Sequence, residues 1–405
     1  MSRQEKLLLF VLGCINFTHI VDFMIMMPMG PQLMRYFHLN PQQFSFLVSA
    51  YSLSAGISGF LAAFVVDRFD RKKVILFGYI GFVAGTLACG LAPTYGLLVA
   101  ARTVAGLFGG LLGAQVMAIV SDAFAYERRA QAMSFVMAAF SVASVVGVPL
   151  GLYLATEISW HAPFLVVGSL GILVTGLVVR FVPRLDAHVQ QRGTRPHPLK
   201  AITTVLHTPN QLRALLLTTV LMLGHFSLIP FLSPALVSNA GFSEKQLYLI
   251  YFIGGFLTIF SAPLVGKLAD RRGKHLVFTV FAILSLLPIL LITNMGPSSM
   301  AYVLSVTSIF FIFTNGRMIP TQAMVSSVVL PQQRGSFMSF NSSVQLLAQA
   351  AATYGAGLII QKAPTGQLLH YNWVGYMAVT LIFLSIFIAR TVKAVDKAPV
   401  AVPAE

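Results

Sequence analysis

Charged residues are scarce in this 405-residue chain: they make up 10% of it, whereas hydrophobic residues make up 57%. A soluble domain has about 25% charged residues. So few charged side chains cannot cover the surface of a water-soluble fold, whereas lipid can face apolar surface directly. The composition therefore excludes an ordinary soluble domain and predicts an integral membrane protein.

Several chemical motifs are also missing. The chain has no G-x-x-x-x-G-K-[ST] sequence and therefore no P-loop for nucleotide hydrolysis. It has no H-E-x-x-H sequence, and its two cysteines, Cys14 and Cys89, stand in apolar segments without metal or redox spacing. We therefore expect no cofactor, no metal and no enzyme activity, and we expect an ion or solute gradient to supply the energy.

Acidic residues are few, because 12 Asp and Glu stand against 27 Lys and Arg, giving a formal net charge of +15. Nucleic-acid binding could explain such a charge, but the distribution of the charges contradicts it. In our segmentation, 22 Lys and Arg fall in loops on the side of the N-terminus and only three fall opposite, Arg35, Lys245 and Lys362. This positive-inside pattern predicts an inner-membrane protein with both termini in the cytoplasm and no nucleic-acid partner.

Twelve apolar segments, each near or above the ~20 residues that span a bilayer as a helix, follow one another along the chain. Their approximate bounds are 7–30, 43–66, 74–92, 95–122, 131–156, 161–182, 211–237, 246–268, 275–294, 299–328, 335–361 and 371–391.

This pattern predicts an all-α membrane protein with one six-helix bundle at 1–182 and another at 211–391. A basic cytoplasmic linker at 183–210, which could also bind lipid headgroups or a partner, separates them. A cytoplasmic tail at 392–405 ends the chain.

The two halves repeat one another. VVDRFDRKKVILF at 65–77 matches LADRRGKHLVF at 268–278, which aligns Asp67 with Asp270. A second match at an offset of 205 residues follows in the same order, and each half begins its last helix with one of the only two tryptophans. The duplication predicts two pseudo-symmetric bundles with the substrate site between them, near the middle of the membrane.

In its loops and helices the chain resembles the major facilitator superfamily over essentially its whole length. The loop motif of that family, roughly G-x-x-x-D-R-x-G-R-[RK], is intact in the second half: Gly266, Asp270, Arg271, Gly273 and Lys274. The first copy keeps its charges at Asp67, Arg68, Arg71 and Lys72, with Ala63 and Asp70 where the family usually has glycine. The resemblance implies that both loops lock and release a cytoplasmic gate.

Two helices carry further motifs of this family. Arg102 and Gly106 form R-x-x-x-G in the fourth predicted helix, and Gly147-Val148-Pro149-Leu150-Gly151 lies in the fifth. The second motif resembles the glycine-proline motif of drug/proton antiporters in its sugar-efflux-type form, with Val148 splitting the usual Gly-Pro pair. The resemblance implies a gating role for Gly147, Pro149 and Gly151 and a function in proton-coupled efflux.

Asp22 is the only acidic residue well inside a predicted helix. A carboxylate there is costly unless it is paired, protonated or in contact with water. At a rise of about 1.5 Å per residue, Asp22 and Arg102 both fall in the outer half of the membrane, where they can meet. We predict that Asp22 binds the coupling proton under the influence of Arg102; a structural ion pair is the alternative.

Two histidines accompany this carboxylate. His19 lies one turn before Asp22, and His225 is the counterpart of Asp22 in the second half, at an offset of 203 residues. Histidine titrates near neutral pH, so either ring could share the proton. Each could equally serve only as a hydrogen-bond partner.

Arg317, in the tenth predicted helix, is the second buried cation. A guanidinium binds carboxylates and phosphates with paired donors, so Arg317 could hold an anionic substrate group; alternatively it pairs with Asn315, Gln322 or a carbonyl. Amides at every fourth residue form one polar stripe on the eleventh helix: Asn341, Gln345 and Gln349. The stripe either lines a cavity or holds helices together.

Prolines stand toward the outer ends of the first and seventh helices, at Pro28 and Pro31 and at Pro230 and Pro234. They predict bends that belong to an extracellular gate, or simple helix ends.

We therefore predict a monomeric, proton-coupled transporter that exports a small polar or amphiphilic metabolite or drug by alternating access. Its partners are the substrate, protons and the bilayer. An importer or facilitator of an anionic or zwitterionic solute is the alternative within transport. A membrane enzyme or sensor is the alternative of another class, but the sequence has neither clustered catalytic motifs nor an attached signalling domain.

Overall fold

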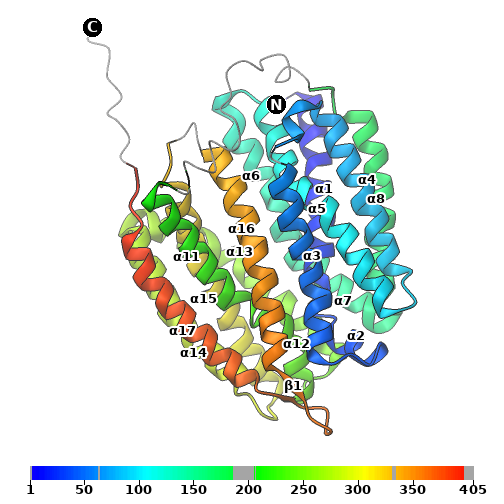
Figure 1. Ribbon diagram of the computed structural model, residues 1–405, viewed down its shortest axis with the longest axis vertical. Helices are drawn as coiled ribbons and strands as arrows, with labels where there is room; N and C mark the ends of the chain where they lie inside the picture. Colours follow the sequence, from blue (N-terminus) through cyan, green and yellow to red (C-terminus); the bar gives the residue numbers. More distant parts are fainter. Residues whose placement is uncertain (1, 63, 186–204, 206, 331–333, 396–405) are drawn as a thin grey trace.

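The computed structural model describes residues 2–62, 64–185, 205, 207–330 and 334–395. Long helices run from one end of the molecule to the other (Figure 1). Within the described ranges, the only strands are the two-residue β1 (Gln361–Lys362) and β2 (Leu368–Leu369), which pair antiparallel. We call the end where α1 begins and α17 ends the terminal side, and the other end the opposite side.

The N-terminal bundle consists of α1 (Arg3–Ile25), α2 (Gly30–Tyr36), α3 (Pro41–Ala62), the turn η1 (Val66–Arg68), α4 (Arg71–Gly90), α5 (Tyr95–Ala123), α6 (Tyr126–Val142), the π-helical segment η2 (Ala143–Gly147), α7 (Val148–Glu157) and α8 (Ala162–Phe181). The C-terminal bundle consists of α11 (Pro209–Phe226), α12 (Ile229–Ser238), the turn η3 (Glu244–Gln246), α13 (Leu247–Arg272), α14 (Lys274–Thr293), α15 (Met300–Ser326), α16 (Arg334–Ile359) and α17 (Tyr371–Thr391). Most of the predicted linker, 186–204 and 206, and the tail from 396 onward lie outside the described residues.

Eleven helical segments of the described chain are long and apolar enough to cross a membrane. The twelfth, α16, has 26 residues but is less apolar, because it contains the amide stripe and Arg334. The predicted all-α membrane fold with two six-helix bundles is therefore confirmed.

Matching caps at corresponding helices express the internal repeat in structure. The Thr94 side chain accepts a hydrogen bond from the Leu97 amide at the start of α5, and Ser299 does the same for Tyr302 at the start of α15. The two caps are again 205 residues apart. A capped first turn satisfies backbone donors that would otherwise be exposed at the end of a helix.

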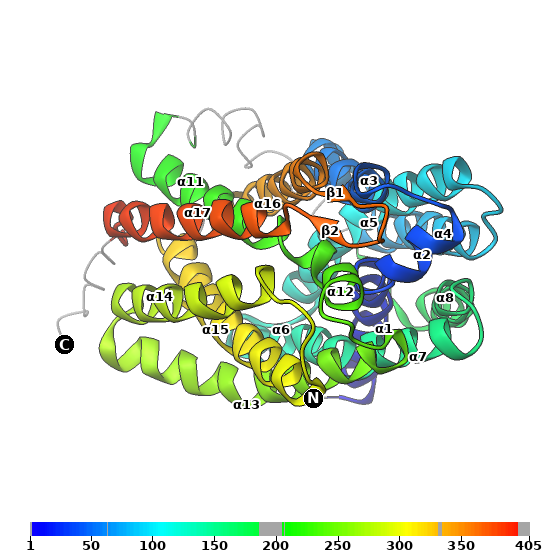
Figure 2. The same ribbon diagram turned by 90° about the horizontal axis from the view of Figure 1, so that it is seen from below.

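The prolines interrupt the helices where the sequence predicts bends. The first span breaks at 26–29, between α1 and α2, and the seventh breaks at 227–228, between α11 and α12. Proline lacks a backbone donor and cannot continue the hydrogen-bond ladder. Gly30 is required at the first break, because a Cβ there would collide with Pro234 and Phe44. This close approach brings α2 and α12 together between the bundles (Figure 2).

The two bundles share a hydrophobic core on the opposite side. Met29, Phe44 and Phe231 belong to one buried cluster that contains residues of both bundles. A second cluster, which includes Leu12 and Val116, belongs largely to the N-terminal bundle. The bundles are therefore sealed together at the opposite side.

The contacts between bundles differ between two seams. The α3 and α16 helices pack along most of their length, from Phe46 against Tyr354 to Phe60 against Phe340. The α13 helix meets α7 and η2, but in its terminal half only Val265 and Ala269 are buried. Contact between the bundles is therefore more extensive along the seam of α3 and α16 than along the seam of α13.

Candidate functional site

Asp22 and Arg102 form an ion pair in the interior of the N-terminal bundle. Arg102 Nη1 donates to Asp22 Oδ2 at 2.8 Å and to the Asp22 carbonyl at 3.3 Å. Both side chains are buried, with 1% of Arg102 and none of Asp22 exposed. The structure thus brings together the two residues that the helical rise predicts to meet, one from α1 and one from α5.

Two further helices complete the surroundings of this pair. From α4, the Thr86 hydroxyl donates to Asp22 Oδ1 at 3.1 Å. From α3, the Tyr51 ring lies under the guanidinium of Arg102, 4.3 Å from ring centroid to Cζ. Both carboxylate oxygens therefore have donors, and the arginine has a carboxylate and an aromatic face as partners.

His19 lies near this pair, against two aromatic rings. Its ring is 5.6 Å from the Phe82 ring and 6.4 Å from the Tyr51 ring, between centroids. Gly109 of α5 faces both Tyr51 and the Nε2 atom of His19, and a Cβ at Gly109 would collide with the tyrosine hydroxyl. The small residues of α5 therefore let the aromatic and histidine side chains approach the helix.

The glycine-proline motif packs against the same helix as Asp22. A Cβ at Gly147 would collide with Val21, and one at Gly151 would collide with Ile25. Pro149 is the second residue after η2, where the helix widens to a π-turn. On the other side of this turn, the Ser144 carbonyl lies close to Gly255 of α13 in the other bundle. The glycine-proline motif therefore lies between α1 and the C-terminal bundle.

Arg317 occupies the interior of the C-terminal bundle, and none of its surface is exposed. Its Nη1 atom donates to the Ser285 hydroxyl of α14 at 2.7 Å. Its Nε and Nη2 atoms are buried and have no hydrogen-bond partner. Asn315 and Gln322 are not its partners: Asn315 donates to the Phe311 carbonyl, and Gln322 is exposed.

The other predicted site residues of this bundle also have few hydrogen-bond partners. His225 Nδ1 is buried without a partner. Asn341 is 1% exposed, and neither its oxygen nor its nitrogen has a partner. Gln345 is half-buried, and the Gln349 nitrogen is 3.9 Å from Met222 Sδ.

The loop before α4 is held by ionic contacts. Arg71 is buried, and its Nε donates to Asp122 Oδ2 at 3.0 Å. Asp70, which replaces a family glycine, caps α4 by accepting from the Lys72 amide at 2.7 Å. Arg68 is exposed, and the Asp67 side chain lies outside the part of the chain that the structure describes. Asp70, at a position where the family usually has glycine, therefore caps the start of α4.

The corresponding loop of the second half is open to solvent. Asp270 and Arg271 are exposed at the end of α13. Gly273 adopts a φ of 92°, a left-handed conformation that favours glycine, and it joins α13 directly to α14. Gly266 faces open space, because a Cβ there would have no neighbour within 4 Å.

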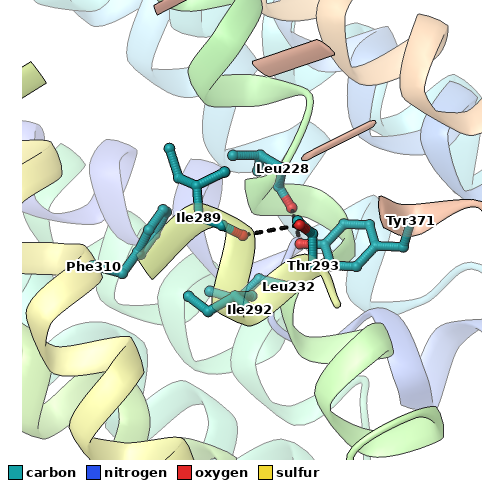
Figure 3. A pocket seen from close by; sticks show the side chains of 7 residues that line it. All are labelled: Leu228, Leu232, Ile289, Ile292, Thr293, Phe310 and Tyr371. Atoms are coloured by element: carbon teal, nitrogen blue, oxygen red, sulfur yellow. Dashed lines mark hydrogen bonds between the residues drawn. The ribbon is translucent and has the colours of Figure 1, made fainter. Parts of the chain in front are cut away.

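A small space near the break between α11 and α12 has a mainly apolar lining and is not a candidate substrate site. It is lined by Leu228, Leu232, Ile289, Ile292, Thr293, Phe310 and Tyr371 (Figure 3). The Tyr371 hydroxyl donates to the Leu228 carbonyl at 3.1 Å, and Thr293 donates to Ile289 of its own helix. The bond from Tyr371 ties α17 to the break at Leu228. Among the described residues, no cluster of His, Cys, Asp or Glu could hold a metal ion.

The sequence gives no direct sign of several contacts that shape these sites. Thr86 and Ser285 are isolated polar residues in apolar helices, which is the only available signal for them, whereas Tyr51 stands among serines and carries no such signal. On the opposite side, Arg35 pairs with Glu244 from the other bundle through two contacts of 2.6 and 2.9 Å. Neither residue stands in a motif.

Comparisons with known proteins agree with this architecture. A family model described as Major Facilitator Superfamily matches residues 12–353. A Bacillus subtilis (strain 168) protein named uncharacterized MFS-type transporter YceJ is 23% identical over 393 residues, covering 93% of this chain and 94% of its own.

Solved structures share the fold. A bacterial homolog of the human lysosomal transporter Spinster, in an inward-facing and unoccupied conformation, has a TM-score of 0.72 at 16% identity and covers 97% of this chain and 95% of its own. A POT family transporter in complex with 5-aminolevulinic acid has a TM-score of 0.75 at 15% identity and covers 97% of both chains.

Proposed function

Because this chain belongs to the Major Facilitator Superfamily and is therefore a multi-pass membrane transporter rather than an enzyme, we propose that it exports a small polar or amphiphilic solute in exchange for protons. The observation that carries the proposal is the buried pair of Asp22 and Arg102. Asp22 is the only buried carboxylate among the residues that the structure describes, so it is the residue that can take up and release a proton in the interior.

The surroundings of Asp22 suit a proton carrier. Desolvation favours the neutral acid, whereas the guanidinium of Arg102 and the hydroxyl of Thr86 favour the carboxylate. The two protonation states therefore differ mainly in how strongly α1 is attracted to α5. After proton uptake, Arg102 keeps the Tyr51 ring as a partner.

The packing of α1 offers a route from this pair to the other bundle. Val21 and Ile25 flank Asp22 and contact Gly147 and Gly151, and η2 next to them touches α13. A change in the position of α1 would thus alter the contact between η2 and α13. In this proposal the glycine-proline motif couples protonation to the relative movement of the bundles.

The proposed orientation follows the charge asymmetry of the loops, with the terminal side in the cytoplasm of a bacterial inner membrane. In that orientation the structure is closed to the outside by the contacts of α2 with α12 and of Arg35 with Glu244. The loops of Asp67, Arg68, Arg71, Gly266, Asp270, Arg271 and Gly273 would then close the cytoplasmic side in the alternate state. We propose that a monomer carries out this cycle.

Proton coupling can be tested with inside-out membrane vesicles that contain a pH-sensitive dye. Candidate solutes are added one at a time after an acid interior is established, and a transported solute should raise the interior pH. Asp22→Asn should abolish this solute-dependent proton movement. Glu5→Gln removes an acidic charge from the same helix while keeping its capping position, and it should behave as the wild type.

The result also separates the alternatives. Solute movement that continues in Asp22→Asn with the same pH dependence as in the wild type would overturn the proposed coupling. Solute flux without any proton movement in the wild type would indicate a facilitator. Solute accumulation in right-side-out vesicles would indicate an importer, the direction opposite to the proposed one.

A further inference from the structure

The guanidinium of Arg317 has one edge with no partner. Its Nη1 atom is engaged by Ser285, while Nε and Nη2 are both buried and unpaired. In arginine, the N–H of Nε and one N–H of Nη2 point the same way in the plane of the group. This edge is the one that grips a carboxylate through two parallel hydrogen bonds.

The C-terminal bundle itself holds no acid that can reach this edge. Residues 211–391 contain only two acidic residues, Glu244 and Asp270. Glu244 is paired with Arg35 on the opposite side, and Asp270 is exposed at the terminal end of α13. An unpaired buried charge costs several kcal/mol, so a protein retains one only where something offsets the cost.

We propose that this edge of Arg317 binds the carboxylate of an organic monoanion, and that this monoanion is the transported solute. The inference rests on the proposed transport function and specifies the substrate class. A single guanidinium neutralises a single negative charge, so a monocarboxylate leaves the dry interior uncharged, whereas a dianion such as a phosphate monoester leaves one charge uncompensated.

Aromatic side chains stand one helical turn from the residues that form the Arg317–Ser285 hydrogen bond. Phe281 precedes Ser285 by four residues on α14, and Phe313 precedes Arg317 by four residues on α15. Their rings are 6.0 Å apart between centroids, and Gly316 lies against the Phe281 ring, where a Cβ would collide with it. Binding sites for small organic molecules combine such apolar walls with a few convergent polar groups.

Two other polar side chains without partners lie in the same bundle. Counted along their helices from the terminal side, Arg317 and Asn341 lie at similar depths, about 13 and 10 Å. His225, whose buried Nδ1 atom is also unpaired, lies deeper, about 24 Å along α11. We assign Asn341, which lies at the depth of Arg317, to the polar groups of the solute beyond its carboxylate.

The inference can be tested by binding measurements on the purified full-length protein in detergent. The probes are benzoate, hexanoate and lactate as monocarboxylates, phthalate as a dianion, benzylammonium as a cation, and inorganic phosphate and chloride. Isothermal titration and the shift in Tm are the readouts. At least one monocarboxylate should bind saturably, and more tightly than phthalate, benzylammonium, phosphate or chloride.

Variants then locate the site. Arg317→Gln should weaken monocarboxylate binding about tenfold to hundredfold, and Arg317→Lys, which keeps the charge but loses the paired edge, by about tenfold. Arg390→Gln removes an exposed arginine from the same bundle and should leave binding unchanged. The Tm of each unliganded variant separates loss of binding from loss of folding.

Several outcomes would overturn the inference. They are the absence of saturable binding by all three monocarboxylates in the wild type, undiminished binding in Arg317→Gln, or equal binding of chloride or phosphate, which would indicate an inorganic ion site. Binding in detergent needs no proton gradient. Monocarboxylate binding that depends on Arg317, combined with transport that does not depend on Asp22, would therefore reject the proposed coupling and leave the substrate class standing.

Discussion

Among the residues that the structure describes, each bundle encloses one arginine that is at most 1% exposed, but these two arginines differ in what surrounds them. Arg102 in the N-terminal bundle has a carboxylate at 2.8 Å, with a hydroxyl and an aromatic ring nearby. Arg317 in the C-terminal bundle has one serine hydroxyl and an unpaired edge. The first site is electrically neutral within the fold, whereas the second carries a net positive charge.

This difference suggests a division of labour within a duplicated fold. A neutral pair can change its charge by taking up a proton, which suits it to coupling. An uncompensated cation can be neutralised only by something that enters from outside, which suits it to binding a solute. The counterpart of Asp22 in the second half is His225, so this repeat position supplies no carboxylate to the second bundle.

The largest loss of stability is expected when Arg102, the arginine paired with Asp22, is replaced. Arg102→Met leaves Asp22 buried without its counter-ion, which should cost about 3–5 kcal/mol of stability. Thermal unfolding of the purified protein in detergent, followed by tryptophan fluorescence, measures the change. Asp22→Asn combined with Arg102→Met should recover part of the loss, because no charge is then left unpaired.

A small change in the Tm of Arg102→Met would contradict the comparison of the two arginines. If Arg102→Met unfolded at the wild-type Tm, then the ion pair would contribute little, and the two bundles would not differ in the way that the contacts indicate.

Replacing the buried arginine of the C-terminal bundle is expected to change the stability in the opposite direction. Arg317→Met replaces an unpaired buried charge by an apolar side chain of similar length, and Ser285 keeps its bond to the Ala282 carbonyl. The Tm should therefore rise, by a free energy on the order of 1 kcal/mol. Arg390→Met, at an exposed position of the same bundle, is the matched control. A loss of stability as large as that of Arg102→Met would mean that Arg317 has a structural partner in the fold.

The sequence predicts the helices and the Asp22–Arg102 pair because both follow from distance along the chain. Apolar length defines each span, and the rise per residue gives the depth of a side chain in the membrane. The proline-rich stretches likewise predict the breaks between α1 and α2 and between α11 and α12, because proline acts locally.

Other contacts depend on how each helix is rotated about its axis and on which helices become neighbours. Ser285 meets Arg317, and Thr86 meets Asp22, only after α14 and α4 have taken their rotations. Asn315 and Gln322 stand close to Arg317 in sequence but point elsewhere. Arg35 in α2 and Glu244 in η3 are 209 residues apart, so no periodicity relates them.

The smallest effect is expected where the two bundles meet at an exposed ion pair. Arg35 and Glu244 form two parallel contacts, but 68% of the Arg35 side chain is exposed, so the pair should contribute less than about 1 kcal/mol. Glu244→Gln should therefore leave the Tm almost unchanged. It should nevertheless shift the population toward molecules open on the opposite side by about two- to fivefold, since the pair exists only in the closed arrangement.

A cysteine at the seal between the bundles reports this shift. Met29 is fully buried in the core that the bundles share, so Met29→Cys, in a background of Cys14→Ser and Cys89→Ser, should react with a membrane-impermeant maleimide only when that side opens. Glu244→Gln should speed the labelling, and the charge swap Arg35→Glu with Glu244→Arg should restore the slow rate. Labelling that is equally fast with and without the pair would mean that the apolar seal alone holds the opposite side closed, and that the bundles are coupled through their cores rather than through charge.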